Sequence, residues 1–239
     1  MTEMLFREDA YLSEARGTVI AHTPEGGVVL DGTIFYPTGG GQPGDSGTLS
    51  WAGGELTVAT AVKATAGQVA LVPAAAEPLP AVGMVVTQTL DWERRHRLMR
   101  MHTALHLLSV VIPLPVSGGA VGEVRGRLDF DMPEAPQDKE TLEEHLNQLV
   151  DGDLPVTEDW ITDAALAENP SLVKTMSVAP PTGAGRVRLI RIGSGGDQVD
   201  LQPCGGTHVA RTGEIGGLRL GKIEKKGRQN RRVYLHFDD

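Results

Sequence analysis

Two pairs of potential metal ligands, each with its members four residues apart, place the strongest constraint on how this chain can fold. The first pair, His102 and His106, lies within the apolar segment LMRMHTALHLLSVVI, and the second, Cys204 and His208, lies within PCGGTH. On a helix, positions i and i+4 share one face with Cβ atoms roughly 5–6 Å apart, so both imidazoles of the first pair can turn toward one point. The second pair reaches that point only if the fold joins segments about a hundred residues apart.

The chemistry of the four side chains indicates a metal site. Three imidazole nitrogens and one thiolate form a borderline-soft donor set that favours tetrahedral zinc. Two glycines between Cys204 and His208 relax the backbone, so that a loop can turn both ligands inward. The other interpretation is a buried free cysteine with unrelated histidines. Because two such pairs in a chain with a single cysteine are improbable by chance, we predict one Zn²⁺ per chain, with these ligands: His102, His106, Cys204 and His208.

The first part of the chain predicts a small β-domain. Between residues 17 and 90, β-branched runs alternate with turn signals such as Gly26–Gly27 and Gly53–Gly54. The 30 glycines and 15 prolines of the 239 residues are dispersed among apolar segments, which indicates turns and short strands rather than disorder. Strands at this spacing are typical of a small barrel or sandwich. We therefore expect a β-barrel domain over residues 1–90.

At Asp91 the hydrophobic period changes from that of strands to that of a helix. Asp91 is a good N-cap, and helical spacing continues from it to Pro113. Two shorter helices are expected at about 137–151 and 161–168, and strand-like segments follow. We therefore expect an α+β domain over residues 91–239, with an antiparallel sheet and the zinc site, and an α+β fold class for the whole chain.

The charge is unevenly distributed. The net charge is −9, which argues against indiscriminate binding to nucleic acid, but residues 211–239 carry +4 and the rest −13. A local basic patch could meet one phosphate backbone, although a solvated hairpin of mixed charges is an equal alternative. The polar N-terminus does not resemble a signal peptide, and the longest apolar run is too short to span a bilayer. The single cysteine is typical of a reducing compartment, so we expect a cytoplasmic protein without a membrane partner.

The quoted motifs carry a family likeness. HTALHLL, followed about a hundred residues later by CGGTHV, resembles the editing domain of alanyl-tRNA synthetase and its freestanding relatives, the AlaX alanyl-tRNA editing proteins. The segment FYPTGGGQPGDSG at 35–47 is similar to the glycine-rich motif of the longer AlaX form, and KIEKKGRQNRRVYLHF at 222–237 is similar to the basic C-terminal strands of the family. The chain shows no room for an aminoacylation domain, so it resembles the freestanding form.

This resemblance implies an aminoacyl-tRNA deacylase that hydrolyses mischarged tRNA-Ala carrying serine or glycine. A pocket for alanine cannot strongly reject a side chain that differs by one small group, because such a difference is worth only about 1–3 kcal/mol, so a second site has to sort the product. Neither ATP nor DNA is expected as a partner. Two other functions stay open: a zinc-stabilised RNA-binding module without catalysis, and an unrelated zinc-dependent esterase. The glycine-rich motif argues against the first of these, and the basic tail against the second.

The resemblance also suggests roles for residues outside the metal site. In the glycine-rich motif, backbone N–H groups could bind an ester or ribose oxygen, Thr38 could bind a serine hydroxyl, and Gln42 could hold the carbonyl group or a water. A simple turn is the structural alternative. The candidate catalytic set is Thr38, Gly39, Gly40, Gly41 and Gln42. The candidate tRNA-binding set is Lys225, Lys226, Arg228, Arg231 and Arg232 in the tail, with Arg94, Arg97 and Arg100 on the helix. Sequence alone leaves open whether zinc is structural or contacts the substrate.

Overall fold

The computed structural model describes residues 2–136, 138–176 and 185–238. By its internal contacts the chain divides into two compact units, Met1–Arg97 and Leu98–Asp239. The α+β class and the small antiparallel barrel expected at the N-terminal end are confirmed, whereas the predicted domain limits stay a prediction. No helix in the described parts of the chain has the length and apolar character needed to cross a bilayer.

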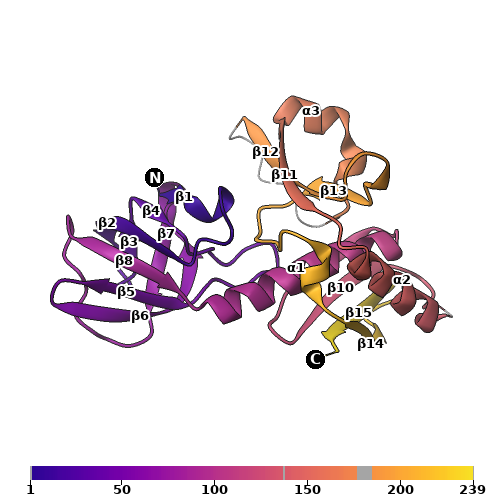
Figure 1. The fold of residues 1–239 in the computed structure, drawn as a ribbon, viewed down its shortest axis with the longest axis horizontal. Coiled ribbons are helices and arrows are strands. Elements are labelled where there is room, and N and C mark those ends of the chain that lie inside the picture. The colour runs from indigo at the N-terminus through magenta and orange to yellow at the C-terminus, as the bar shows by residue number, and fades with distance from the viewer. Residues whose placement is uncertain (1, 137, 177–184, 239) are drawn as a thin grey trace. The chain divides into compact units, whose positions relative to one another are not determined.

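The first unit is built on a closed barrel with the strand order β2-β3-β7-β6-β5-β8 (Figure 1). Its core is a set of fully buried aliphatic and aromatic side chains, among them Leu30, Phe35 and Leu49. Two very short strands, β1 and β4, pair in parallel beside it. The strands are β1 (Glu3–Met4), β2 (Glu14–His22), β3 (Val28–Leu30), β4 (Gly32–Thr33), β5 (Gly47–Trp51), β6 (Gly54–Lys63), β7 (Val69–Pro73) and β8 (Val85–Leu90).

Helix α1 (Trp92–Val111) follows the last barrel strand. The expected N-cap is confirmed, because the Asp91 carboxylate accepts a hydrogen bond from the Arg94 N–H at 3.2 Å. From Leu98 onward almost every side chain of α1 is buried, so the helix passes through the core of the second unit. Strand β10 (Arg125–Asp131) packs against it: a Cβ on Gly126 would lie 2.7 Å from the Met101 sulfur, so a larger residue there would force the Met101 side chain to move.

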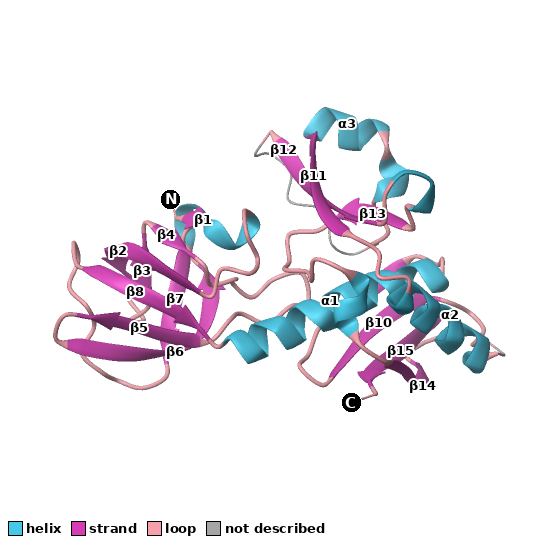
Figure 2. Cartoon of the chain, in the orientation of Figure 1, coloured by secondary structure: helices cyan, strands magenta, loops and turns pink. Residues whose placement is uncertain are grey.

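Two antiparallel sheets complete the second unit (Figure 2). One has the order β14-β15-β10-β9 and the other β11-β12-β13. Short helices lie between and beside their strands. The further elements are β9 (Val116–Ala120), α2 (Lys139–Asp151), β11 (Val156–Thr162), α3 (Asp163–Glu168), β12 (Arg186–Ile192), β13 (Asp200–Pro203), β14 (Leu218–Lys225) and β15 (Asn230–Phe237).

The two shorter predicted helices exist, and both start later than expected. Helix α2 begins at Lys139 because the Asp138 carboxylate caps it, accepting from the Thr141 N–H at 2.9 Å. Helix α3 begins at Asp163 rather than at 161, because Ile161 and Thr162 still pair with β12. Strand β11 itself was not expected, because the sequence VTEDWIT places two adjacent acidic residues in its middle.

Candidate metal centre and glycine-rich loop

The fold brings the two predicted ligand pairs together inside the second unit. Helix α1 presents His102 and His106 on one buried face, with ring centroids 5.4 Å apart. The loop after β13 supplies Cys204, whose Sγ lies 3.5 Å from His102 Nε2 and 3.3 Å from His208 Nε2. One ligand atom from each of the four residues lies within 4.8 Å of all the others. The four side chains could therefore hold one metal ion, and their donor set fits zinc.

Hydrogen bonds behind the histidines determine which nitrogen each one offers. The Nδ1 of His106 lies 3.0 Å from the buried carboxylate of Asp200, so Nδ1 donates and Nε2 is left for a metal. The Thr103 hydroxyl donates to the Met99 carbonyl and therefore accepts from His208 Nδ1 at 3.2 Å. Both rings are thus fixed in the tautomer that coordinates through Nε2.

Charges around the centre favour ligand-competent protonation states for two of the residues. Burial raises the pKa of the Cys204 thiol, but the neighbouring histidines, His102 first, outweigh it and hold the pKa well below its ordinary value. Burial and the charge of His102 lower the pKa of His208 to about 3. At neutral pH His208 is therefore a neutral imidazole, and the lowered pKa of Cys204 favours the thiolate; these are the forms that bind metal.

His106 behaves differently in the metal-free protein. Burial lowers its pKa, but hydrogen bonds with Asp200 and Cys204, together with their charges, raise it to about 9. The same contact also changes the pKa of Asp200. Burial raises this pKa, but His106 and Lys174 outweigh burial and lower it to about 2. A metal ion must therefore displace a proton from His106.

Four supporting residues were not anticipated from the sequence: Lys174, Arg188, Asp200 and Gln202. Lys174 donates to Asp200 at 2.6 Å, and Gln202 donates to the same carboxylate at 2.8 Å. Arg188 of β12 donates to the carbonyls of Cys204 and Gly206 at 3.1 and 2.8 Å, which holds the loop that carries Cys204. The only available signal was Asp200 and Gln202 standing just before Cys204 on alternate positions of a strand.

The glycine-rich segment forms a tight loop in the first unit. Gly39 and Gln42 exchange two backbone hydrogen bonds of 3.0 and 2.9 Å, so Gly40 and Gly41 form the tip. These two glycines have φ values of +57° and +83°, a region that favours glycine. Both tip residues are exposed, and their N–H groups have no hydrogen-bond partner within the described chain. The tip can therefore donate to a ligand oxygen.

The two side chains predicted to act in this loop differ in exposure. Thr38 is exposed, and its hydroxyl accepts from the Gly44 N–H at 2.9 Å and donates to the Ala61 carbonyl at 3.3 Å. Since a hydroxyl has two acceptor sites, one remains for a further donor. Gln42 is 1% exposed. Its side chain is thus packed inside the unit, whereas its neighbours at the tip face solvent.

The predicted tRNA-binding cations fall into paired and unpaired groups. Arg232 binds both oxygens of Asp129 at 2.7 and 2.9 Å, and Lys226 binds Glu224. Arg231 donates to backbone carbonyls. Lys225 and Arg228 are exposed and have no side-chain partner among the residues described.

The three arginines predicted on α1 all have partners of their own. Arg94 donates to the Gly44 carbonyl at 2.9 Å, and Arg97 pairs with Glu93 at 3.3 Å on the exposed surface. Arg100 donates to the Ile215 carbonyl at 2.8 Å and stacks over the Phe237 ring. Of the three arginines, Arg97 alone is held just by an exposed ion pair, and such a pair contributes little stabilisation in water.

Comparison with known proteins gives matches along the whole chain. Residues 187–234 match the family model described as the threonyl and alanyl tRNA synthetase second additional domain, and residues 10–94 match that of the class II (A) tRNA synthetases. The alanyl-tRNA editing protein AlaX-M of Methanosarcina acetivorans is 34% identical over 100% of both chains. AlaX-M of Saccharolobus solfataricus is 33% identical over 98% of both. The alanine–tRNA ligase of Caldivirga maquilingensis is 37% identical over 94% of this chain and 25% of its own length.

Proposed function

The chain belongs to the family of the alanyl-tRNA editing proteins AlaX-M, and from this premise we propose that it hydrolyses the ester of tRNA-Ala charged with serine or glycine. The observation that carries the proposal is the convergence of the four ligand atoms from α1 and the loop after β13, in a chain similar to AlaX-M over its full length. We propose one zinc ion per chain as the occupant, and the cytoplasm as the location.

Hydrolysis of an aminoacyl ester needs a water molecule placed against the carbonyl carbon and a partner for the oxygen that gains charge. When bound, zinc would supply a positive charge able to orient the amino group of the substrate or a water. The chain itself contributes the frame: Asp200 and Thr103 orient the ligand imidazoles, and Arg188 shapes the cysteine loop.

We assign the glycine-rich loop to the aminoacyl group on the basis of its own chemistry. The unpartnered N–H groups of Gly40 and Gly41 can donate to a carbonyl or ribose oxygen, and the spare acceptor site of Thr38 suits a serine hydroxyl. Gln42 and Gly39 close the loop through their backbone bonds. The exposed cations of the β14–β15 hairpin would meet the phosphate backbone of the tRNA.

Deacylation assays with seryl-, glycyl- and alanyl-tRNA-Ala test the proposal. The protein should release serine or glycine much faster than alanine, and Cys204→Ala should lose both zinc and this activity. His145→Ala is the matched control, because His145 is exposed on α2 outside the ligand cluster. A protein that binds tRNA-Ala and hydrolyses none of the three esters would instead be an RNA-binding module.

A further inference from the structure

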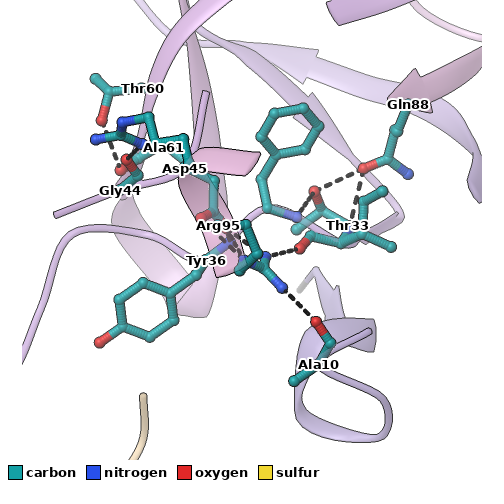
Figure 3. Close-up of polar contacts among 12 residues, drawn as sticks. Ala10, Thr33, Tyr36, Gly44, Asp45, Thr60, Ala61, Gln88 and Arg95 are labelled. Carbon is teal, nitrogen blue, oxygen red and sulfur yellow. Dashed lines mark hydrogen bonds and ion pairs between the residues drawn. The ribbon is translucent and has the colours of Figure 1, made fainter. Parts of the chain in front are cut away.

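A buried arginine at the start of α1 is bonded to the base of the glycine-rich loop. Arg95 is fully buried, and its Nε lies 3.0 Å from each carboxylate oxygen of Asp45 (Figure 3). Its other nitrogens donate to the carbonyls of Ala10 and Ile34 at 2.9 and 2.6 Å. All these contacts lie within the first unit, and together they leave Arg95 without freedom to change its geometry.

Asp45 connects Arg95 to the glycine-rich loop through hydrogen bonds with Tyr36. Its carboxylate accepts from the Tyr36 N–H at 2.5 Å, and its own N–H donates to the Tyr36 carbonyl at 3.0 Å. Tyr36 and Asp45 thus close the two ends of the segment that contains residues 38–42. Next to them, Arg94 donates to the Gly44 carbonyl at 2.9 Å. Two consecutive arginines of α1 therefore hold the two residues at the base of the loop.

The backbone at the base of the loop is also closely packed against its surroundings. A Cβ on Gly44 would lie 2.1 Å from the Ala61 carbonyl oxygen, so the chain runs directly against strand β6 at this point. The Gly44 N–H is bonded to the Thr38 hydroxyl at 2.9 Å. A displacement of Asp45 would consequently be transmitted to Thr38 and to the tip rather than absorbed locally.

Stability alone is a weak reason for this arrangement, because a buried ion pair is often no better than apolar side chains of the same volume. What the pair supplies is fixed geometry. We propose that Arg95 and Asp45 are a positioning pair, which sets the shape of the glycine-rich loop and thereby its discrimination among aminoacyl groups. This inference rests on the proposed function of the loop and adds the residues that hold it.

The same barrel offers a matched control. Gln88 is fully buried, and its side-chain oxygen accepts from the Thr33 hydroxyl at 2.7 Å (Figure 3) and from the Ile34 N–H at 3.2 Å. Its amide nitrogen donates to the Gly32 carbonyl at 3.1 Å. It thus restrains β4 and Ile34, and within the described residues none of its hydrogen bonds reaches the segment from Tyr36 to Asp45. Gln88→Met therefore removes buried hydrogen bonds of the barrel while those of the Asp45 carboxylate stay in place.

The experiment compares Asp45→Asn, the milder Arg95→Lys and Gln88→Met with the parent protein. Each is measured while fully folded, at matched distance from its unfolding midpoint, for zinc content and for hydrolysis of seryl- and glycyl-tRNA-Ala. Asp45→Asn should slow hydrolysis about tenfold to a hundredfold, as expected when reacting groups are misplaced. It should also change the ratio of the two rates at unchanged zinc content, with Arg95→Lys in the same direction and Gln88→Met near the parent.

Amide hydrogen exchange of Gly39, Gln42 and Gly44 gives a readout that needs no activity. Exchange at these positions should rise in Asp45→Asn and Arg95→Lys and stay at the parent value in Gln88→Met. If the parent protein hydrolysed no mischarged tRNA-Ala, the proposed function would fail while this pattern would still support the positioning role. Unchanged loop exchange, parent-like hydrolysis in Asp45→Asn, or an equal loss of activity in Gln88→Met would overturn the inference.

Discussion

Asp200 determines what His106 can offer. By accepting from Nδ1, its carboxylate leaves Nε2 for a metal, yet it also stabilises the imidazolium, whose pKa burial alone would lower. Lys174 and Gln202 both donate to the same carboxylate. Asp200 therefore orients His106 for a metal and also favours its protonated form, so a proton competes with the metal for His106.

This competition predicts a pH dependence. His208 is already neutral at neutral pH and the lowered pKa of Cys204 favours its thiolate, whereas His106, with a pKa raised to about 9, carries the second ring proton of an imidazolium. The apparent zinc affinity should rise about tenfold per pH unit between pH 7 and about pH 9 and then flatten. Calorimetry in buffers of different ionisation enthalpy should find about one proton released at pH 7.5. Release of two would contradict the assigned thiolate.

The same shift predicts how the metal-free protein responds to pH. The folded-state pKa of His106 lies above its unfolded value of 6.5, so its contribution to stability is complete below pH 6.5 and is lost as the pH rises through 9. Urea unfolding of chelator-treated protein should therefore show this contribution disappearing across that window. In His106→Gln this loss should be absent, and only the opposite trend from the lowered pKa of Cys204 should remain, so the difference between the two proteins isolates His106.

Thr38 allows a test of the loop at the level of one hydroxyl. Thr38→Val removes the bond to the Gly44 N–H for every substrate, and the proposed bond to a serine hydroxyl for seryl-tRNA alone. One neutral hydrogen bond is worth about 0.5–1.5 kcal/mol, so the ratio of seryl to glycyl hydrolysis rates should fall about two- to tenfold. Thr38→Ser, which keeps the hydroxyl, should preserve the ratio. An unchanged ratio in Thr38→Val would make Thr38 a structural loop residue.

The β14–β15 hairpin shows why a count of charges is a poor guide to an RNA surface. Glu224 binds both Lys222 and Lys226, and Asp129 binds Arg232, so each of these cations already has a carboxylate partner that a phosphate would have to replace. Burial raises the pKa of Asp129, but its bonds to Arg232 and Arg127 outweigh burial and lower the pKa below its ordinary value, so this carboxylate is ionised at neutral pH. The cations available to phosphate are the exposed ones near the turn.

A pair of single variants separates the two groups of cations. Arg228→Gln removes an exposed charge that has no partner in the described structure, and Lys222→Gln removes one already bound to Glu224. Arg228→Gln should weaken tRNA-Ala binding and lower the slope of log K against log salt by about 0.9. Lys222→Gln should change it by clearly less. Equal slopes in the two variants would place the RNA surface elsewhere on the chain.

At the scale of elements, the sequence predicted the features that depend on residues close together in the chain. Asp91 and the period change fix the start of α1, and the turn signals of the first ninety residues predict the barrel strands. Strand β11 was missed because its glutamate and aspartate find partners only across the sheet: Glu158 pairs with Arg188, and Asp159 with Arg191 at 2.7 Å. The cluster of four candidate metal ligands was predictable from their spacing, but Lys174 reaches Asp200 through tertiary structure alone.

At the scale of the molecule, the two units have separate cores, and all four candidate metal ligands belong to the second. Metal removal should therefore destabilise that unit selectively. At a free zinc concentration a hundred times its dissociation constant, binding contributes about 2.7 kcal/mol, which chelation would remove.

The tryptophans provide local reporters for this prediction. Trp160 lies on β11 in the second unit, while Trp51 lies on β5 in the barrel. The chain has a third tryptophan, Trp92 on α1, so the variants must keep Trp160 or Trp51 as the single tryptophan. The chelator-induced drop in the unfolding midpoint should appear with Trp160 and not with Trp51. Equal drops would mean that the two units unfold as one.

The distance along the chain between the ligand pairs has a consequence for the newly made protein. While the ribosome is still translating, His102 and His106 emerge well before Cys204 and His208. A nascent chain therefore presents two ligands of four, and the completed centre must wait for the loop after β13. Zinc binding and folding are coupled when a site is not preformed. Only chains that have been synthesised through residue 208 and have folded around the metal would therefore retain it.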